Sequence, residues 1–358
     1  MIAAEPGLAV VTGATGHLGN VLTRQLAASG LRVRAVVPGF EEPGLVLGTG
    51  VEVAVADVRD QGSLQRAFRD ARRVFHLAGV VTISTGQRRL LEEVNVRGTR
   101  NVVLACLETG VERLVYTSSV HALGEPAGGS PIREQREFRP ECLFGDYAWS
   151  KARASIEVMA GVGRGLDAVV VFPSGIVGPH DYRLSELGTL FLSVLGGRMR
   201  VYIDGAYDFV DVRDVADGCM SAMENGRTGQ GYILSGNRVT VREMLVELDR
   251  YAVRRPFRVR APMWAARAGA VFSPAYYRLT RKKPVLTGYS LRVLGSNCRM
   301  DRTKAETELG YRARPFAETV KDFAAWLRET GRLGPRAGNE KRTRFACTPR
   351  PARGPGLV

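Results

Sequence analysis

The feature that most constrains the fold is a glycine-spaced turn near the start of the chain, in the sequence VVTGATGHLG. Gly13, Gly16 and Gly19 follow a short apolar run at residues 8–12 and precede residues 17–29, whose leucines recur at helical spacing. Glycines let the backbone turn sharply and approach a pyrophosphate, whose charge is stabilised at the N-terminus of the following helix. The turn therefore predicts a strand–turn–helix unit that binds a dinucleotide.

The alternation of strands and helices continues through the first half of the chain. Further strands are predicted at residues 31–37, 51–57, 73–79, 111–119 and 167–175, and helices at 62–71, at 91–110 and around Tyr147. Apolar runs that are each followed by a helix are typical of a parallel sheet covered on both faces. Right-handed crossovers then predict an α/β fold with a doubly wound parallel sheet, in which ligands bind at the carboxyl ends of the strands.

Beyond about residue 180 this rhythm loosens. A turn into a helix is predicted at 209–226, a short strand at 231–236, and helices at 240–252 and 315–331. We therefore expect a dinucleotide-binding domain at 1–180 and a smaller α/β substrate-binding domain at 181–330, from which some strands return to the sheet. Residues 331–358 form a basic tail rich in proline and glycine, and we expect disorder there because few apolar residues offset the ordering entropy.

The formal net charge of +15 raises the question of a nucleic-acid partner. Of the 51 basic residues only 6 are lysine, which leaves 45 arginines. So uniform a use of arginine indicates a compositional bias of the genome more than a phosphate-binding face. No specific nucleic-acid partner is therefore expected.

The cysteines and the apolar segments bear on compartment and membrane. The five cysteines are scattered without metal-ligand or disulfide spacing, and no signal peptide is evident, so we expect no metal and a cytoplasmic location. The most membrane-like run, residues 261–277, is interrupted by Arg267 and Pro274 and is too short to span a bilayer. We interpret it as an apolar helix of the substrate domain, and the basic residues on both sides of it leave peripheral contact with anionic lipid open.

Several motifs occur in an order and at intervals that together are specific. They are TGATGHLG, ADVRD, HLAG, NVRGTRNV, VYTSSVHALG, YAWSK, PSGIVGP and FVDVRDVADG. From residue 8 to about residue 330 the chain resembles the extended short-chain dehydrogenase/reductase (NAD-dependent epimerase/dehydratase) superfamily, in its branch of dihydroflavonol-reductase-like and 3β-hydroxysteroid-dehydrogenase-like proteins. The resemblance implies a Rossmann domain, a small-molecule substrate and a homodimer formed through the helices at 91–109 and 147–161.

The resemblance also implies a set of cofactor-binding residues around the glycine turn and the strand ends. They are Gly13, Thr15, Gly16, His17, Leu18, Gly19, Asp57, Val58, Leu77, Ala78, Gly79, Asn95, Ser118, Tyr147, Lys151, Pro173 and Ile176. The acidic residue that would bind the ribose of NAD is missing, because Pro38 and Gly39 end the second strand and Glu41 lies further along. The sequence therefore favours NADP(H) over NAD(H), although no arginine occupies the expected place either.

Tyr147 and Lys151 are the candidate proton-transfer pair, with Ser119 as a third catalytic residue. Residues four apart project from one helix face, so both side chains can face the nicotinamide end of the cleft. Tyrosine has an ordinary pKa near 10, and a neighbouring ammonium together with an oxidised nicotinamide would stabilise its phenolate. Tyr147 would then donate a proton to a carbonyl oxygen that Ser119 polarises, as hydride reaches the carbon.

Three functions follow from this arrangement. The first is an NAD(P)-dependent oxidoreductase that interconverts a ketone and a secondary alcohol on an apolar substrate of the steroid or flavonoid kind. The alternative is a nucleotide-sugar epimerase with tightly bound NAD, in which Arg213 would contact a phosphate. A cofactor-sensing regulator is the non-enzymatic possibility, and it is disfavoured because both Tyr147 and Lys151 are present.

Overall fold

A seven-stranded sheet runs through the centre of the computed structural model, which describes residues 7–45, 50–82, 86–126, 129–135, 137–270 and 288–335. Its strands are β1 (Leu8–Thr12), β2 (Val33–Val37), β3 (Glu52–Val55), β4 (Ala71–His76), β5 (Arg113–Thr117), β6 (Ala168–Pro173) and β10 (Gly231–Leu234). They lie in the order β10-β6-β5-β4-β1-β2-β3, and every pair is parallel. The predicted doubly wound α/β fold is confirmed, and the strand order reverses between β1 and β4, where such sheets bind ligands.

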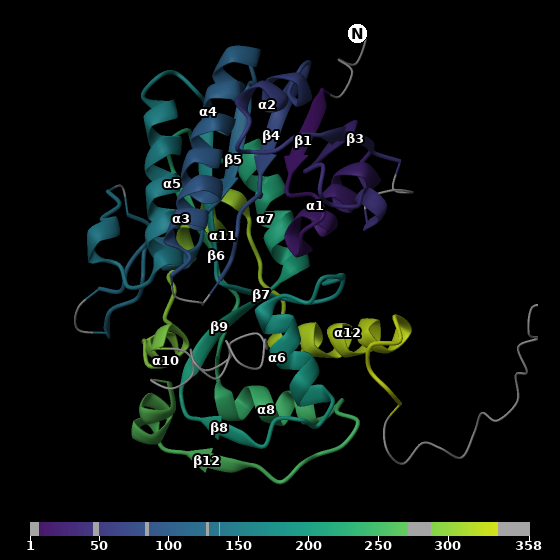
Figure 1. Cartoon of the computed structure of the whole chain (residues 1–358), viewed down its shortest axis with the longest axis vertical. Coiled ribbons are helices and arrows are strands. Elements are labelled where there is room, and N and C mark those ends of the chain that lie inside the picture. Colours follow the sequence, from purple (N-terminus) through teal and green to yellow (C-terminus); the bar gives the residue numbers. More distant parts are fainter. Residues whose placement is uncertain are drawn as a thin grey trace, which may run out of the picture.

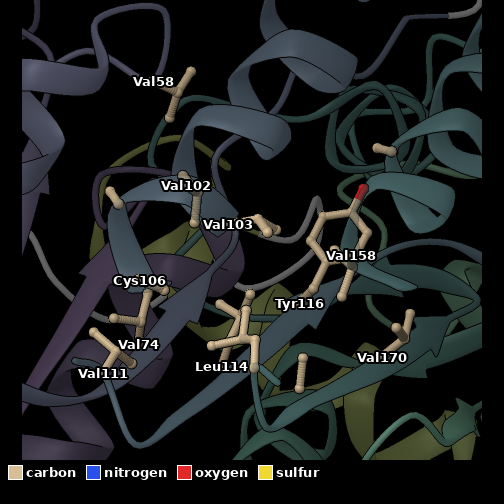
Figure 2. Packing of buried hydrophobic residues seen from close by; sticks show 14 of the residues in the cluster. Val58, Val74, Val102, Val103, Cys106, Val111, Leu114, Tyr116, Val158 and Val170 are labelled. Carbon is tan, nitrogen blue, oxygen red and sulfur yellow. The ribbon is translucent and has the colours of Figure 1, made fainter. Parts of the chain in front are cut away.

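Helices cover both faces of this sheet (Figure 1). One face carries α1 (His17–Ala28), α7 (Val212–Asn225) and α11 (Thr303–Leu309), and the other carries α2 (Gln61–Ala67), α4 (Gly98–Thr109) and α5 (Asp146–Val162). Figure 2 shows the core on the second face, where Val74 and Leu114 of the sheet pack against Val103 and Cys106 of α4 and Val158 of α5. The runs of apolar residues in the strands are thus buried on both sides, as in other parallel sheets.

The helix predicted at 91–110 is present but not uniform. It begins as α3 (Arg88–Leu91), widens to a π-helical stretch over Glu92–Arg97, and continues as α4. Gly110 ends it with φ of 71°, a left-handed conformation that glycine adopts without a Cβ clash. A π-helical stretch is uncommon and frequently marks a functional position; here it contains Asn95.

A second, smaller layer lies at one end of the main sheet. Its elements are β7 (Gly175–Val177), β9 (Ala206–Asp211) and β11 (Asn237–Thr240) in one sheet, β8 (Val201–Ile203) and β12 (Val259–Ala261) in another, and the helices α6 (Glu186–Leu195), α8 (Val241–Asp249), α10 (Gly288–Leu294) and α12 (Phe316–Glu329). Phe191, Phe209 and Phe323 are at the centre of its core. Strand β9 was missed by the sequence analysis, which expected only a turn into α7. The division of the chain at residue 180 stays a prediction.

The remaining expectations of the sequence analysis concern cysteines, metals and membranes. Cys106, Cys142, Cys219 and Cys298 form no disulfide, and no metal-binding group of side chains occurs in the described part of the chain. Within the same ranges, no helix has the length and hydropathy needed to cross a bilayer. The apolar run predicted as a helix at 261–277 starts at the end of β12 (Val259–Ala261), is helical at 263–270, and lies outside the described residues from 271 on, as does most of the basic tail.

Candidate active site

The glycine turn between β1 and α1 has the close backbone approaches that its sequence predicts. Gly13 has φ of +71°, and a Cβ there would lie 2.7 Å from the backbone nitrogen of Ala78, just after β4. A Cβ on Gly19 would collide with the carbonyl oxygen of Gly13. A Cβ on Gly16 would meet only the Gly13 oxygen, at 3.2 Å, so this part of the turn borders open space. The cradle fits a pyrophosphate at the N-terminus of α1, whose first turn carries no acidic residue.

The loop that follows β7 covers this helix N-terminus. The Nε2 atom of His17, in the first turn of α1, lies 2.9 Å from the carbonyl oxygen of Pro179. Leu18 is buried in the core beneath the turn. His17 thus joins the start of α1 to the loop after β7, whereas Leu18 packs in the core.

An ion pair beside the glycine turn was not predicted from the sequence. The Thr15 hydroxyl donates a hydrogen bond to Glu41, and the Arg183 guanidinium binds both Glu41 carboxylate oxygens at 2.7 Å. The hydrogen bond from Arg183 lowers the pKa of Glu41, so the carboxylate is ionised at neutral pH. In the sequence Glu41 lies beyond the position expected for the ribose-binding acid. No sequence signal marks Arg183, which is 142 residues away from Glu41.

The ends of β3 and β4 form the next part of the wall. Asp57 pairs with Arg59 at 2.6 Å, which lowers the pKa of its carboxyl group, and Val58 packs beneath Gly98. The backbone nitrogens of Leu77 and Ala78 donate to the oxygens of Thr12. The bonds to Thr12 hold the end of β4 against the glycine turn.

Asn95 fixes the segment between β4 and the helix α5. Its Oδ1 accepts a hydrogen bond from the Val80 nitrogen at 2.8 Å, and its Nδ2 donates to the Val80 oxygen and to Ser150 Oγ, each at 3.0 Å. A Cβ on Gly79 would lie 3.2 Å from Asn95 Oδ1 and 3.6 Å from Lys151 Nζ. Gly79 therefore leaves the space between the amide and the ammonium open, while contact of Asn95 with a cofactor stays a prediction.

Tyr147 and Ser119 meet, although they come from different elements. Tyr147 is in the first turn of α5, and Ser119 is the N-cap of a short 3-10 helix (Val120–Ala122) that follows β5. Burial raises the pKa of the Tyr147 phenol to about 12, and the nearby Ser119 side chain partly offsets this rise. The protein groups alone therefore keep the phenol protonated at neutral pH. A lowered pKa requires positive charge beyond what they supply.

Lys151 is 5% exposed and lies one turn further along α5. Its Nζ donates to the carbonyl oxygen of Thr117 at 2.9 Å, and it lies 5.2 Å from the centre of the Tyr116 ring. Burial lowers the pKa of Lys151 to about 8. His76, between Thr12 and Thr99, has its pKa lowered to about 3 by burial and is a neutral packing residue.

The other predicted residues near the strand ends are Ser118, Pro173 and Ile176. Ser118 is buried, and its Oγ lies 2.9 Å from Ser155 Oγ on α5. Pro173 ends β6 opposite Leu234, and Ile176 is the middle residue of β7. These positions lie after β5, at the end of β6 and in β7, and their contacts with a cofactor stay predictions.

Aromatic side chains surround Tyr147 on the side of the second layer. The ring of His121 lies 6.2 Å from that of Tyr147 and 5.7 Å from that of Tyr289, and its Nε2 is 3.1 Å from the Tyr207 hydroxyl. Burial lowers the pKa of His121 to about 4, so the imidazole is neutral. Neither Tyr207 nor Tyr289 could be predicted from the sequence, because nothing local connects β9 or α10 to Tyr147.

Comparison with known proteins agrees with this geometry. The model of the NAD dependent epimerase/dehydratase family matches residues 9–235. The chain is 36% identical to "Sterol demethylase protein B" of Methylococcus capsulatus, over 90% of this chain and 99% of that protein. It is 29% identical to "Putative dihydroflavonol 4-reductase" of Synechocystis, over 90% and 94% of the two chains.

Solved structures give the same result. The crystal structure of gox2253 superposes with a TM-score of 0.81 at 32% identity, covering 92% of this chain and all of that one. The UDP-glucose 4-epimerase of Thermus thermophilus, solved with NAD, superposes with a TM-score of 0.71 at 25% identity, covering 90% of this chain and 99% of that one.

Proposed function

The chain belongs to the NAD-dependent epimerase/dehydratase family and is an NAD(P)-dependent enzyme, and we propose that it interconverts a ketone and a secondary alcohol on an apolar substrate of the steroid or flavonoid kind. The observation that carries this proposal is the phenol of Tyr147, which lies beside the Ser119 hydroxyl and one helical turn from the Lys151 ammonium. The relatives named for sterols and dihydroflavonols support the substrate class.

Each residue of the site has a definite task in this reaction. The nicotinamide, when bound, supplies or accepts the hydride. Ser119 and Tyr147 bind the substrate oxygen, and the phenol donates its proton to that oxygen during reduction or takes the alcohol proton during oxidation. Lys151 lies close enough to Gly79 to hold a ribose hydroxyl there and to stabilise the phenolate.

The preference for NADP(H) over NAD(H) remains a proposal, which one residue of the structure supports and another opposes. Arg183 supports NADP(H), because it brings a cation close to Thr15, whereas no arginine occupies the expected place after β2. The ionised Glu41 opposes it, because a carboxylate repels the 2′-phosphate. Fluorescence titration with NADPH and NADH distinguishes the two, and tighter binding of NADH would overturn the preference.

The second candidate is a nucleotide-sugar epimerase with tightly bound NAD, which the superposition on UDP-glucose 4-epimerase favours. The position of Arg213 opposes it, because its guanidinium is bound to Asp211 and to Asp322, each at 2.8 Å, and not directed at a diphosphate. A cytoplasmic location and a homodimer paired through α4 and α5 are further proposals.

Steady-state assays test the main proposal. Purified protein is incubated with steroid and flavonoid ketones and NADPH or NADH, with Tyr147→Phe as the inactive control. Turnover of a ketone from either panel supports the proposal. Absence of turnover across both panels, with NAD retained through purification and conversion of a nucleotide sugar, would establish the epimerase instead.

A further inference from the structure

The two-stranded sheet at the far end of the second layer leaves an apolar face uncovered. Strands β8 and β12 pair in parallel with Val201 opposite Val259, so these two side chains lie next to each other on one face. Val201 is 56% exposed and Val259 is 53% exposed. Phe257, two residues before Val259, is 84% exposed.

An exposed tryptophan follows this face in the sequence. Trp264 lies in the helical residues 263–270 that follow β12 and is 75% exposed. We call Val201, Phe257, Val259 and Trp264 the apolar tip. It holds four of the ten exposed large apolar side chains of the described residues, and Figure 1 shows β8 and β12 at the end of the molecule away from β1 and α1. Such a concentration marks an interaction surface.

Arginines surround the apolar tip. Residues 198–204 and 254–267 contain seven arginines and a single acidic residue, Asp204. Arg258 is directed inward to Asp249, with Nη2 2.7 Å from Oδ1, and Arg260 pairs with Asp204. The exposed side chains that complete this set are Arg198, Arg200, Arg254, Arg255 and Arg267.

We propose that the apolar tip docks the protein on the surface of an anionic lipid bilayer. Tryptophan and phenylalanine insert at the level of the lipid headgroups, and arginines around them are attracted to the negative surface potential. A second copy of the chain fits less well, because two arginine-rich rims would face each other. The described residues contain no membrane-spanning helix, so this contact is peripheral.

The helical stretch that carries Trp264 also lines a cavity next to the candidate active site. Arg267, on the same helical stretch as Trp264, lines a cavity of about 540 Å³ together with Phe144 and Leu291. The Phe144 ring stacks on Tyr289 with 6.3 Å between centroids, and Tyr289 contacts His121. Docking does not depend on the proposed reaction, so the two can fail separately.

Co-sedimentation of the full chain with vesicles tests the docking. We expect binding to vesicles of phosphatidylcholine mixed with phosphatidylglycerol, weaker binding to phosphatidylcholine alone, and weaker binding as salt is raised. A blue shift of tryptophan emission on binding should disappear in Trp264→Phe, because Trp326 is buried and Trp149 lies under Arg88.

Paired variants separate the tip from the net charge of the protein. The double variant Phe257→Ser with Trp264→Ser should bind anionic vesicles on the order of tenfold more weakly, whereas Phe40→Ser, equally exposed at 75% but on the dinucleotide side, should bind normally. The double variant Arg254→Gln, Arg255→Gln should weaken vesicle binding about tenfold or more. Its control, the double variant Arg69→Gln, Arg100→Gln, removes the same charge elsewhere on the surface and should not weaken binding.

Three results would overturn the proposal. The first is equal loss in the tip and control variants, which would assign the binding to net charge. The second is undiminished binding by both tip variants. The third is a dimer in size-exclusion chromatography with light scattering that the Phe257→Ser, Trp264→Ser variant abolishes, which would make a second copy the occupant.

Discussion

Replacing Lys151 by methionine should stabilise the protein at neutral pH while abolishing its activity. Burial lowers the pKa of Lys151 from 10.5 to about 8, and its ammonium has one backbone acceptor, the Thr117 oxygen. The protonated Lys151 therefore destabilises the folded state relative to the unfolded chain, in which the same ammonium is solvated. Methionine has a similar length and carries no charge into the same space.

The magnitude follows from the pKa change. A drop from 10.5 to about 8 corresponds to about 3 kcal/mol of destabilisation at pH 7. Loss of the hydrogen bond to Thr117 offsets about 1 kcal/mol, so Lys151→Met should raise the free energy of unfolding by about 2 kcal/mol. A group whose pKa is lower when folded binds fewer protons when folded, so wild-type stability rises with pH between about 8 and 10.5 and the advantage of the variant disappears there.

Denaturant unfolding without cofactor, at pH 7 and at a pH near the ordinary lysine pKa, measures this difference. Titration of the groups around Lys151 should not alter the pH range over which the two proteins differ, because burial keeps His76 neutral and Tyr147 protonated. Lys321→Met, at an exposed position on α12, is the matched control and should show no such pH dependence. A variant less stable than wild type at pH 7, or a difference that is the same at both pH values, would refute the reasoning.

Four further results are expected. Tyr147→Phe should lower turnover by about 10² to 10⁴ while dinucleotide affinity, measured by fluorescence titration, stays unchanged; retained turnover would contradict its role. Glu41→Gln should tighten NADPH relative to NADH by about tenfold or more, and an unchanged ratio of dissociation constants would rule out Glu41 as a selectivity residue. His121→Leu should raise KM for the substrate more than it lowers kcat, because the imidazole ring packs beside Tyr147 and it is the His121 backbone nitrogen that bonds Ser119; a fall in kcat as large as the rise in KM would contradict this. Oxidation should accelerate with rising pH, because the phenol is protonated below a pKa of about 12, and reduction should not; parallel pH profiles would contradict the assignment.

Most of the main sheet could be predicted because its signals are local. Each buried strand is a short apolar run, and glycines with defined tasks mark the boundaries, such as Gly13 in the turn and Gly110 at the end of α4. Strand β9 was missed because its sequence, AYDFVD, alternates weakly and runs directly into α7. Its partners β7 and β11 are distant in sequence, so its strand character depends on tertiary pairing.

The candidate site likewise has a part that local sequence predicts and a part that it does not. Tyr147 and Lys151 are four residues apart, and Ser119 follows a strand, so their proximity to one cleft follows from helix geometry and sheet topology. Glu41 with Arg183, and His121 with Tyr207, join residues that are 142 and 86 positions apart. Side-chain contacts over such separations follow from how the second layer packs on the sheet, which no local pattern encodes.

Burial moves the two proton-transfer groups in opposite directions, and this bears on how the site works. It raises the pKa of Tyr147 to about 12 and lowers that of Lys151 to about 8, so both groups are pushed toward their neutral forms. Reduction needs the protonated phenol, which the folded chain already provides. Oxidation needs the phenolate, whose charge becomes favourable when a cation lies within a few ångströms in a medium of low dielectric constant. Lys151 supplies part of that charge at neutral pH, so the direction of proton transfer depends on the charge of what is bound beside it.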